Sequence, residues 1–132
     1  MDPFIDTASW PVVRLHMPDH VPDASSEILL NDLKALYAKQ DRFVLIMTGA
    51  ELPQNSPRFM ADYLAWSRET VALQSRFCAG AVRVEPGPER RRTYEKQASA
   101  LNQSGKSPYP YSVAASLEAA LLTAAEWLKI NA

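Results

Sequence analysis

Residues 109–130 read YPYSVAASLEAALLTAAEWLKI and contain the clearest change of pattern in the chain. The segment from Tyr109 to Ala115 is short and extended in character, and its Pro110 favours a strand start or an edge strand, since proline cannot donate to a central ladder. From Ser116, a favoured N-cap residue, apolar residues recur at helical spacing up to Ile130. The segment therefore predicts a strand followed by an amphipathic helix.

The same succession of strand and helix occurs three more times upstream. Strands are predicted over residues 10–17, 42–48 and 79–85, and helices over residues 25–39 (from Ser25 or Ser26), 56–76 and 89–101. The run from Arg42 to Thr48 is almost wholly apolar, which is typical of a central strand covered on both faces, whereas Pro11 places the first strand near an edge. Four β-α units predict an α/β fold with a small, mostly parallel or mixed sheet of four to five strands covered by helices.

The length and composition favour one domain over residues 1–132, preceded by an N-terminal arm of residues 1–9. Fourteen basic against fifteen acidic residues give a net charge of −1, which argues against a nucleic-acid partner. No apolar run approaches the roughly 20 residues of a membrane span. The single cysteine excludes an internal disulfide, and the first residues lack the pattern of a signal peptide, so a cytoplasmic location is predicted.

Three segments give this order a resemblance to a known family. They are Arg76-Phe-Cys-Ala-Gly-Ala-Val-Arg-Val84, the strand Tyr109-Pro-Tyr-Ser-Val113, and the final helix that ends in Trp127-Leu128. Across roughly residues 10–128 the chain resembles bacterial STAS-like domains of the anti-sigma-factor-antagonist type, especially the divergent sporulation-antagonist-like group. The resemblance implies a noncatalytic regulatory module that binds another protein.

The resemblance also implies a switch by phosphorylation of a serine or threonine at the start of the helix that follows a central strand. The matching position here is Ser56, and Thr48 at the end of the preceding strand is a second candidate. The family's Asp-Ser-Ser-Gly-like signature is replaced by Asn55-Ser-Pro57. A helix N-terminus accommodates a phosphate well, but Ser56 before Pro57 is equally the pattern of a simple N-cap.

Residues with catalytic or metal-binding chemistry are few. His16, Asp19 and His20 have metal-ligand side chains, and a strand end followed by a loop could bring two of them together. No third protein ligand is visible, so a structural role is the stronger interpretation. Cys78 has no histidine near it in the sequence and is interpreted as a buried small hydrophobe. Gly49 and Gly87 belong to no phosphate-binding motif. The sequence thus predicts no catalytic residue, no metal and no cofactor.

The helix predicted from Ser56 to Arg76 carries more apolar residues than one buried face requires. Met60, Leu64 and Val71 form one line. A second line is the candidate partner-binding surface, formed by Phe59, Tyr63, Trp66 and Leu73. The alternative is that this second line is covered by loops or by the N-terminal arm with Phe4, Ile5 and Trp10.

Three functions follow from these observations. The first is a STAS-like protein-interaction or regulatory module, with another protein or a second copy in a homodimer as partner. The second is a domain that binds a small apolar, lipid-like ligand, because STAS-like folds resemble lipid-binding domains of the same architecture. The third is a small enzyme that uses His16, Asp19 or Cys78 in a cleft at the carboxyl ends of the strands.

Overall fold

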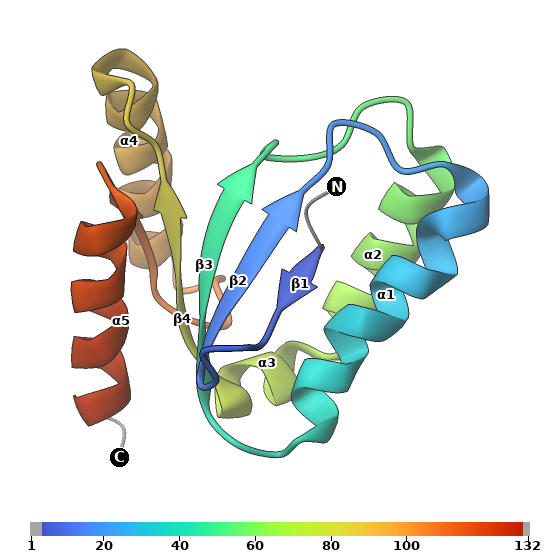
Figure 1. Ribbon diagram of the computed structural model, residues 1–132, viewed down its shortest axis with the longest axis horizontal. Helices are drawn as coiled ribbons and strands as arrows, with labels where there is room; N and C mark the ends of the chain where they lie inside the picture. The colour runs from blue at the N-terminus through green and yellow to red at the C-terminus, as the bar shows by residue number, and fades with distance from the viewer. Residues whose placement is uncertain (1–3, 131–132) are drawn as a thin grey trace.

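A five-stranded sheet forms the centre of the computed structural model, which describes residues 4–130 (Figure 1). The strands are β1 (Ile5–Asp6), β2 (Val12–Met17), β3 (Phe43–Gly49), β4 (Cys78–Val84) and β5 (Tyr111–Ala114). The helices are α1 (Asp23–Ala38), α2 (Pro57–Glu69), α3 (Val71–Phe77), α4 (Pro88–Ser104) and α5 (Leu117–Ile130). Among the described residues, no helix has the length and apolar character needed to cross a lipid bilayer.

The strands lie in the sheet in the order of the sequence, β1-β2-β3-β4-β5. β1 runs antiparallel to β2, and the other neighbouring pairs are parallel. The predicted α/β fold with a mostly parallel, mixed sheet is confirmed. β3 is central, as its apolar run predicts, and β5, which follows Pro110, lies at an edge.

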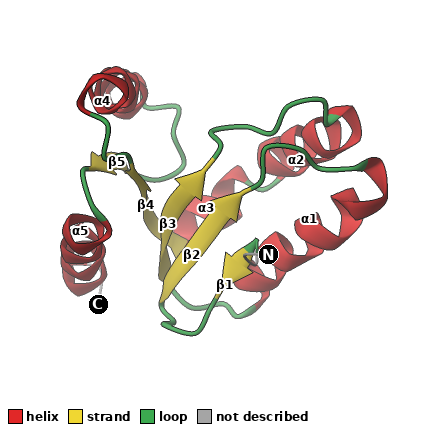
Figure 2. Cartoon of the chain, turned by 45° about the horizontal axis from the view of Figure 1, so that its top comes forward, coloured by secondary structure: helices red, strands yellow, loops and turns green. Residues whose placement is uncertain are grey.

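Helices cover both faces of this sheet (Figure 2). The larger core lies on the face covered by α1, α2 and α3, around Phe43, Leu45 and Leu36. On the opposite face α5 packs on Val44, Ile46 and Val82, and its Ala120 and Ala124 belong to this smaller core. The amphipathic character predicted for the final helix thus describes the face that it turns to the sheet.

The helix α4 lies beside the edge strand β5. The side-chain amide of Asn102 donates to the Tyr111 carbonyl at 2.8 Å and accepts from the Tyr111 N–H at 3.0 Å. These two bonds occupy backbone groups of β5 that would otherwise be free at the edge of the sheet. Asn102 therefore joins the end of α4 to the start of β5.

One contact fixes how closely α5 approaches the sheet. Gly80 of β4 has no side chain, and the ring of Trp127 occupies the space that a Cβ atom there would need. A glycine inside a strand commonly marks such a close approach. Trp127 and Gly80 together therefore set the position of α5 on the sheet.

The structure corrects three local predictions. The predicted helix from residue 56 to 76 is two helices, because the backbone of Thr70 leaves helical geometry (φ −117°, ψ 24°) and its hydroxyl donates back to the Trp66 carbonyl. α1 begins at Asp23 rather than at Ser25 or Ser26; Ser26 is buried and donates to Asp62 of α2 instead of capping. The arm predicted over residues 1–9 contains β1, while residues 1–3 lie outside the described part.

Candidate functional site

A cavity of about 60 Å³ lies between the sheet and the helices of the larger core, toward the carboxyl ends of β2, β3 and β4. Open parallel sheets usually bind ligands at these ends. Aliphatic and aromatic side chains supply most of its wall: Phe4, Leu15, Met17, Leu33, Tyr37, Leu45, Met47, Ala50, Leu52, Tyr63, Trp66 and Tyr109. Such a wall suits an apolar molecule with a small number of polar groups.

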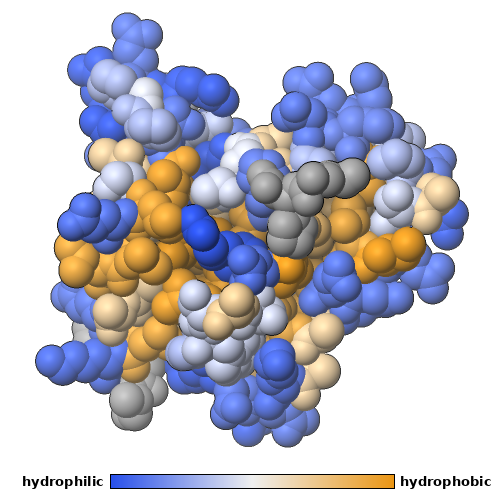
Figure 3. All heavy atoms as spheres, viewed as in Figure 1, coloured by the Kyte–Doolittle hydropathy of each residue, from blue (hydrophilic) through white to orange (hydrophobic). Residues whose placement is uncertain are grey.

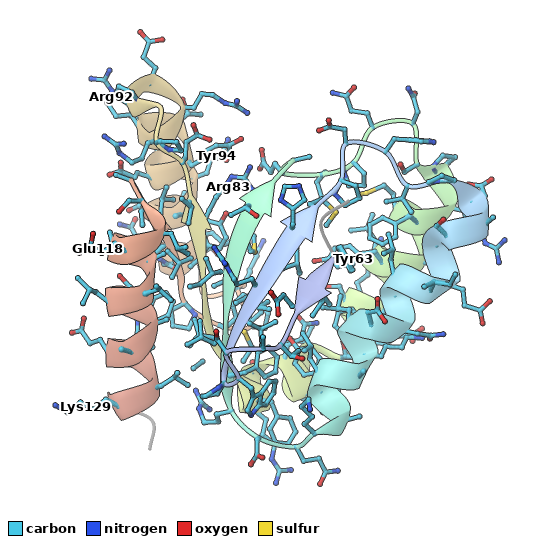
Figure 4. The ribbon with its side chains drawn as sticks, viewed as in Figure 1. Tyr63, Arg83, Arg92, Tyr94, Glu118 and Lys129 are labelled. Carbon is cyan, nitrogen blue, oxygen red and sulfur yellow. The ribbon has the colours of Figure 1, made fainter. Side chains whose placement is uncertain are left out.

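Arg83 is the one cationic side chain among the residues that line this cavity. It projects from β4 and is only 2% exposed. Its Nη2 donates to the Gly49 carbonyl at 2.5 Å, and its Cζ lies 4.7 Å from the centre of the Tyr94 ring. Figure 4 shows Arg83 beside Tyr94 near the upper end of β4, with Tyr63 on the side of α2. The guanidinium is thus held by one carbonyl and one ring face.

The guanidinium of Arg83 has no carboxylate partner within residues 4–130. The ion pairs found there, Arg58–Asp62 and Arg91–Glu95, connect neighbouring turns of α2 and α4. In addition, the Nε of Arg83 is buried and has no hydrogen-bond acceptor among the described residues. Because a buried charge normally requires an opposite charge and a full set of hydrogen bonds, this arginine is the most unusual polar group of the core.

The turn after β3 determines where the Arg83 side chain is anchored. Gly49 has φ +83°, and a Cβ atom at this position would collide with the Met17 carbonyl oxygen. Only glycine adopts this conformation without strain. The turn aims the Gly49 carbonyl at Arg83, and the following N–H of Ala50 donates to the Met17 carbonyl at 3.0 Å.

The mouth of the cavity is formed by the residues that follow this turn. Ala50 is half-buried, whereas Glu51 and Leu52 are exposed and also line the cavity. Glu51 makes no ion pair with Arg83 at 4.0 Å or less. The cavity therefore joins the surface beside a carboxylate that faces the same space as the buried cation.

Three tyrosines are among the residues that line the cavity. Burial raises the pKa of Tyr37, Tyr63 and Tyr109 above the ordinary value of 10.0. Desolvation penalises the phenolate form, so these groups stay protonated at neutral pH and can donate hydrogen bonds. The tyrosines therefore add no charge to the wall of the cavity.

The two predicted phosphorylation positions have structural partners. Ser56 is 3% exposed; its Oγ accepts from the Val21 N–H at 2.7 Å and donates to the Gln54 carbonyl at 2.8 Å. The hydroxyl makes no cap bond to the helix, so the predicted N-cap role is wrong for the side chain, which instead joins the loops before α1 and α2. Thr48 shares a hydrogen bond with His16 at 2.9 Å. Phosphorylation of Ser56 would require the buried hydroxyl to become accessible and would remove the bond that it donates to Gln54.

Most of the candidate partner-binding line faces inward. Phe59 is 1% exposed, so its predicted place on a surface is wrong: Phe4 covers it edge-on at 6.4 Å, as in the alternative involving the N-terminal arm. Tyr63 and Trp66 are half-buried against the cavity. Leu73 is exposed and remains a predicted contact for a partner. In the line formed by Met60, Leu64 and Val71, the last two are exposed, whereas Met60 packs against the larger core.

The candidate metal-binding and catalytic residues are not brought together. His16 bonds to Thr48, while His20 bonds to the Gln54 carbonyl at 3.0 Å. Cys78 begins β4 opposite Phe43, five residues from the Thr48 level of the sheet, or roughly 16 Å along a strand. Burial raises the pKa of its thiol to about 12, so the thiol is neutral at neutral pH. No group of three metal-ligating side chains occurs within residues 4–130.

The sequence pattern around Arg83 does not mark it as a functional residue. Its position in β4, between Val82 and Val84, is that of an outward-facing residue in a half-buried strand. A different feature does indicate that Arg83 is unusual: a strand covered by helices on both faces has no side that faces solvent. An arginine in such a strand must be buried.

No protein-family model, no curated protein and no solved structure matches the chain.

Proposed function

We propose that the chain is a noncatalytic binding domain of STAS-like architecture that takes a small, mainly apolar ligand into the cavity beside Arg83. The observation that carries this proposal is the cavity itself. It lies at the carboxyl ends of parallel strands and has mostly aromatic and aliphatic walls. The separation of Cys78 from the histidines supports a role without catalysis.

The size of the cavity limits the mode of entry. A volume of about 60 Å³ is well below the roughly 150 Å³ of an engineered cavity that admits benzene. A ligand with several carbon atoms therefore requires the cavity to enlarge. The segment from Ala50 to Leu52 is the natural gate, because Leu52 is 52% exposed and lacks the packing of the remaining walls.

Three tryptophans allow a direct test of this site. Trp66 lines the cavity, Trp10 packs near Phe43, and Trp127 lies on the other face against Gly80. Protein labelled with 5-fluorotryptophan is titrated with 1-alcohols from ethanol to 1-hexanol and followed by ¹⁹F NMR. We expect a saturable shift of the Trp66 signal, with affinity rising roughly threefold to fourfold per methylene until the cavity is filled.

A matched pair of variants locates the entrance. Ala50→Leu narrows the mouth and should weaken 1-hexanol binding, whereas Ala35→Leu makes the same change at an exposed position of α1 and should leave it unchanged. Equal shifts at all three tryptophans, or an affinity independent of chain length, would contradict the proposed ligand site.

A second candidate function is the protein-interaction module that the resemblance implies. It is favoured by an apolar patch on α5, where Leu122 is 71% exposed and Leu121 is 42% exposed (Figure 3). If this face joins two copies, Leu122→Glu should lower the mass measured by sedimentation. Ile28 of α1 is 63% exposed on the opposite side of the sheet, so Ile28→Glu is the control and should leave that mass unchanged. A monomeric wild-type protein would eliminate the homodimer.

A further inference from the structure

We infer that the ligand is a small monocarboxylate, whose carboxylate pairs with Arg83 while its hydrocarbon part occupies the apolar cavity. This inference rests on the proposed function, since it names the ligand class for the same cavity. It starts from the most unusual group of the core: a guanidinium that is 2% exposed, lines the cavity and has a buried Nε without an acceptor in the described part of the chain.

The Nε of Arg83 is the recognition element. A guanidinium presents its N–H groups in a planar fork that matches the two oxygens of a carboxylate. Nη2 is already directed at the Gly49 carbonyl, and the ring of Tyr94 covers the guanidinium carbon, so the side chain is held before any ligand arrives. A carboxylate that accepts from Nε supplies both the missing acceptor and the missing negative charge.

The charges around the cavity select a monoanion. Arg83 is the only cation among the lining residues, and Glu51 adds a carboxylate at the mouth. With one arginine and one glutamate the formal charge of the empty site is zero, so a dianionic phosphate would leave the occupied site at −2, whereas a monocarboxylate leaves it at −1. A carboxylate group is also smaller than a phosphate group, which leaves more of a space of about 60 Å³ for the hydrocarbon part.

The remaining walls indicate what the carboxylate carries. Leu45 and Met47 of β3 and Trp66 of α2 are apolar neighbours of the same space. They offer contact area to an alkyl or aryl group but few hydrogen bonds. The inferred ligands are thus short-chain or small aromatic carboxylic acids, which expose a single anionic group at one end.

The test compares carboxylates with alcohols of equal carbon number. Butyrate and hexanoate are titrated against 1-butanol and 1-hexanol, with the Trp66 fluorine signal as one readout. We expect each carboxylate to bind roughly tenfold to a hundredfold more tightly than its alcohol, as a charge-assisted hydrogen bond provides. In parallel, the ¹⁵N-labelled Nε–H signal of Arg83 should shift with hexanoate and remain in place with 1-hexanol.

Two variants assign the preference to the guanidinium. Arg83→Met should abolish the advantage of hexanoate while 1-hexanol still binds, and Arg83→Lys should restore part of it. Arg92→Met removes the same charge from an exposed position of α4 and should leave the advantage intact (Figure 4). If Arg83→Met does not fold, the Nε–H shift in the wild-type protein decides the question alone.

The two possible failures are distinguishable. If alcohols bind with a chain-length dependence but carboxylates bind no better, and the Nε–H signal does not move, the monocarboxylate inference is wrong and the apolar site stands. If neither series shifts Trp66, the proposed function itself is wrong.

Discussion

Gly80→Ala is expected to lower the free energy of unfolding by about 1–3 kcal/mol, although alanine is among the mildest substitutions in general. The added methyl group would collide with the Trp127 ring, and both residues belong to the contact that places α5 on the sheet. Relief requires either a shift of α5 away from Ala79 and Val82 or a distorted rotamer of Trp127. Urea denaturation followed by circular dichroism measures the loss.

A double-mutant cycle tests the cause of that loss. Trp127→Ala alone should cost about 3–5 kcal/mol, as is usual for truncation of a large packed aromatic residue. In the Trp127→Ala background, Gly80→Ala should cost little, because the methyl group then enters space that the ring has left. Additive costs of the two substitutions would mean that Gly80 matters through its backbone and not through Trp127.

The sequence is sufficient to predict the architecture because the decisive patterns are local. The apolar run of β3, the proline before β5 and the periodic α5 each specify an element independently of the others. The break at Thr70 escapes prediction because helical periodicity continues across it, and it depends on a hydroxyl that bonds to Trp66. β1 escapes prediction because two residues are too short for any period.

The site is far less predictable than the fold. Spacing places Phe59 and Trp66 in a different line from Leu64, but it does not tell which line faces the core, and Leu73 and Met60 depart from the lines predicted for them. That depends on α1 and the N-terminal arm, which come from distant parts of the sequence. The cavity likewise exists only where β3, β4 and α2 meet, and Arg83 acquires its unusual environment from Tyr94 of a later helix.

Arg83→Met is expected to leave the free energy of unfolding unchanged or to raise it by up to about 2 kcal/mol in the absence of ligand. Burial of a charge without an opposite charge costs several kcal/mol, and the bond to Gly49 together with the contact to Tyr94 offsets much of that cost. A methionine fills similar space without a charge. A fully structural arginine would behave differently, and its removal would cost about 2–4 kcal/mol through loss of the hydrogen bond to Gly49 and the contact with Tyr94.

Arg42 provides the matched control for this prediction. It also has a buried Nε without an acceptor in the described residues, but it is half-exposed, donates to the Arg76 carbonyl at 2.9 Å and does not line the cavity. Arg42→Met should therefore cost about 0.5–1.5 kcal/mol, the ordinary value of a lost hydrogen bond. Opposite signs for the two arginines would distinguish a binding group from a structural one.

Addition of hexanoate links this stability difference to binding. A ligand that binds only the folded state stabilises it by about 2.7 kcal/mol at a concentration of one hundred times its dissociation constant. Hexanoate should raise the free energy of unfolding of the wild-type protein. For Arg83→Met, hexanoate should raise it no more than 1-hexanol does. If Arg83→Met is both destabilised and equally responsive to hexanoate, Arg83 serves the fold. A variant that is more stable but has lost the response would mean that the chain retains this buried charge for its ligand.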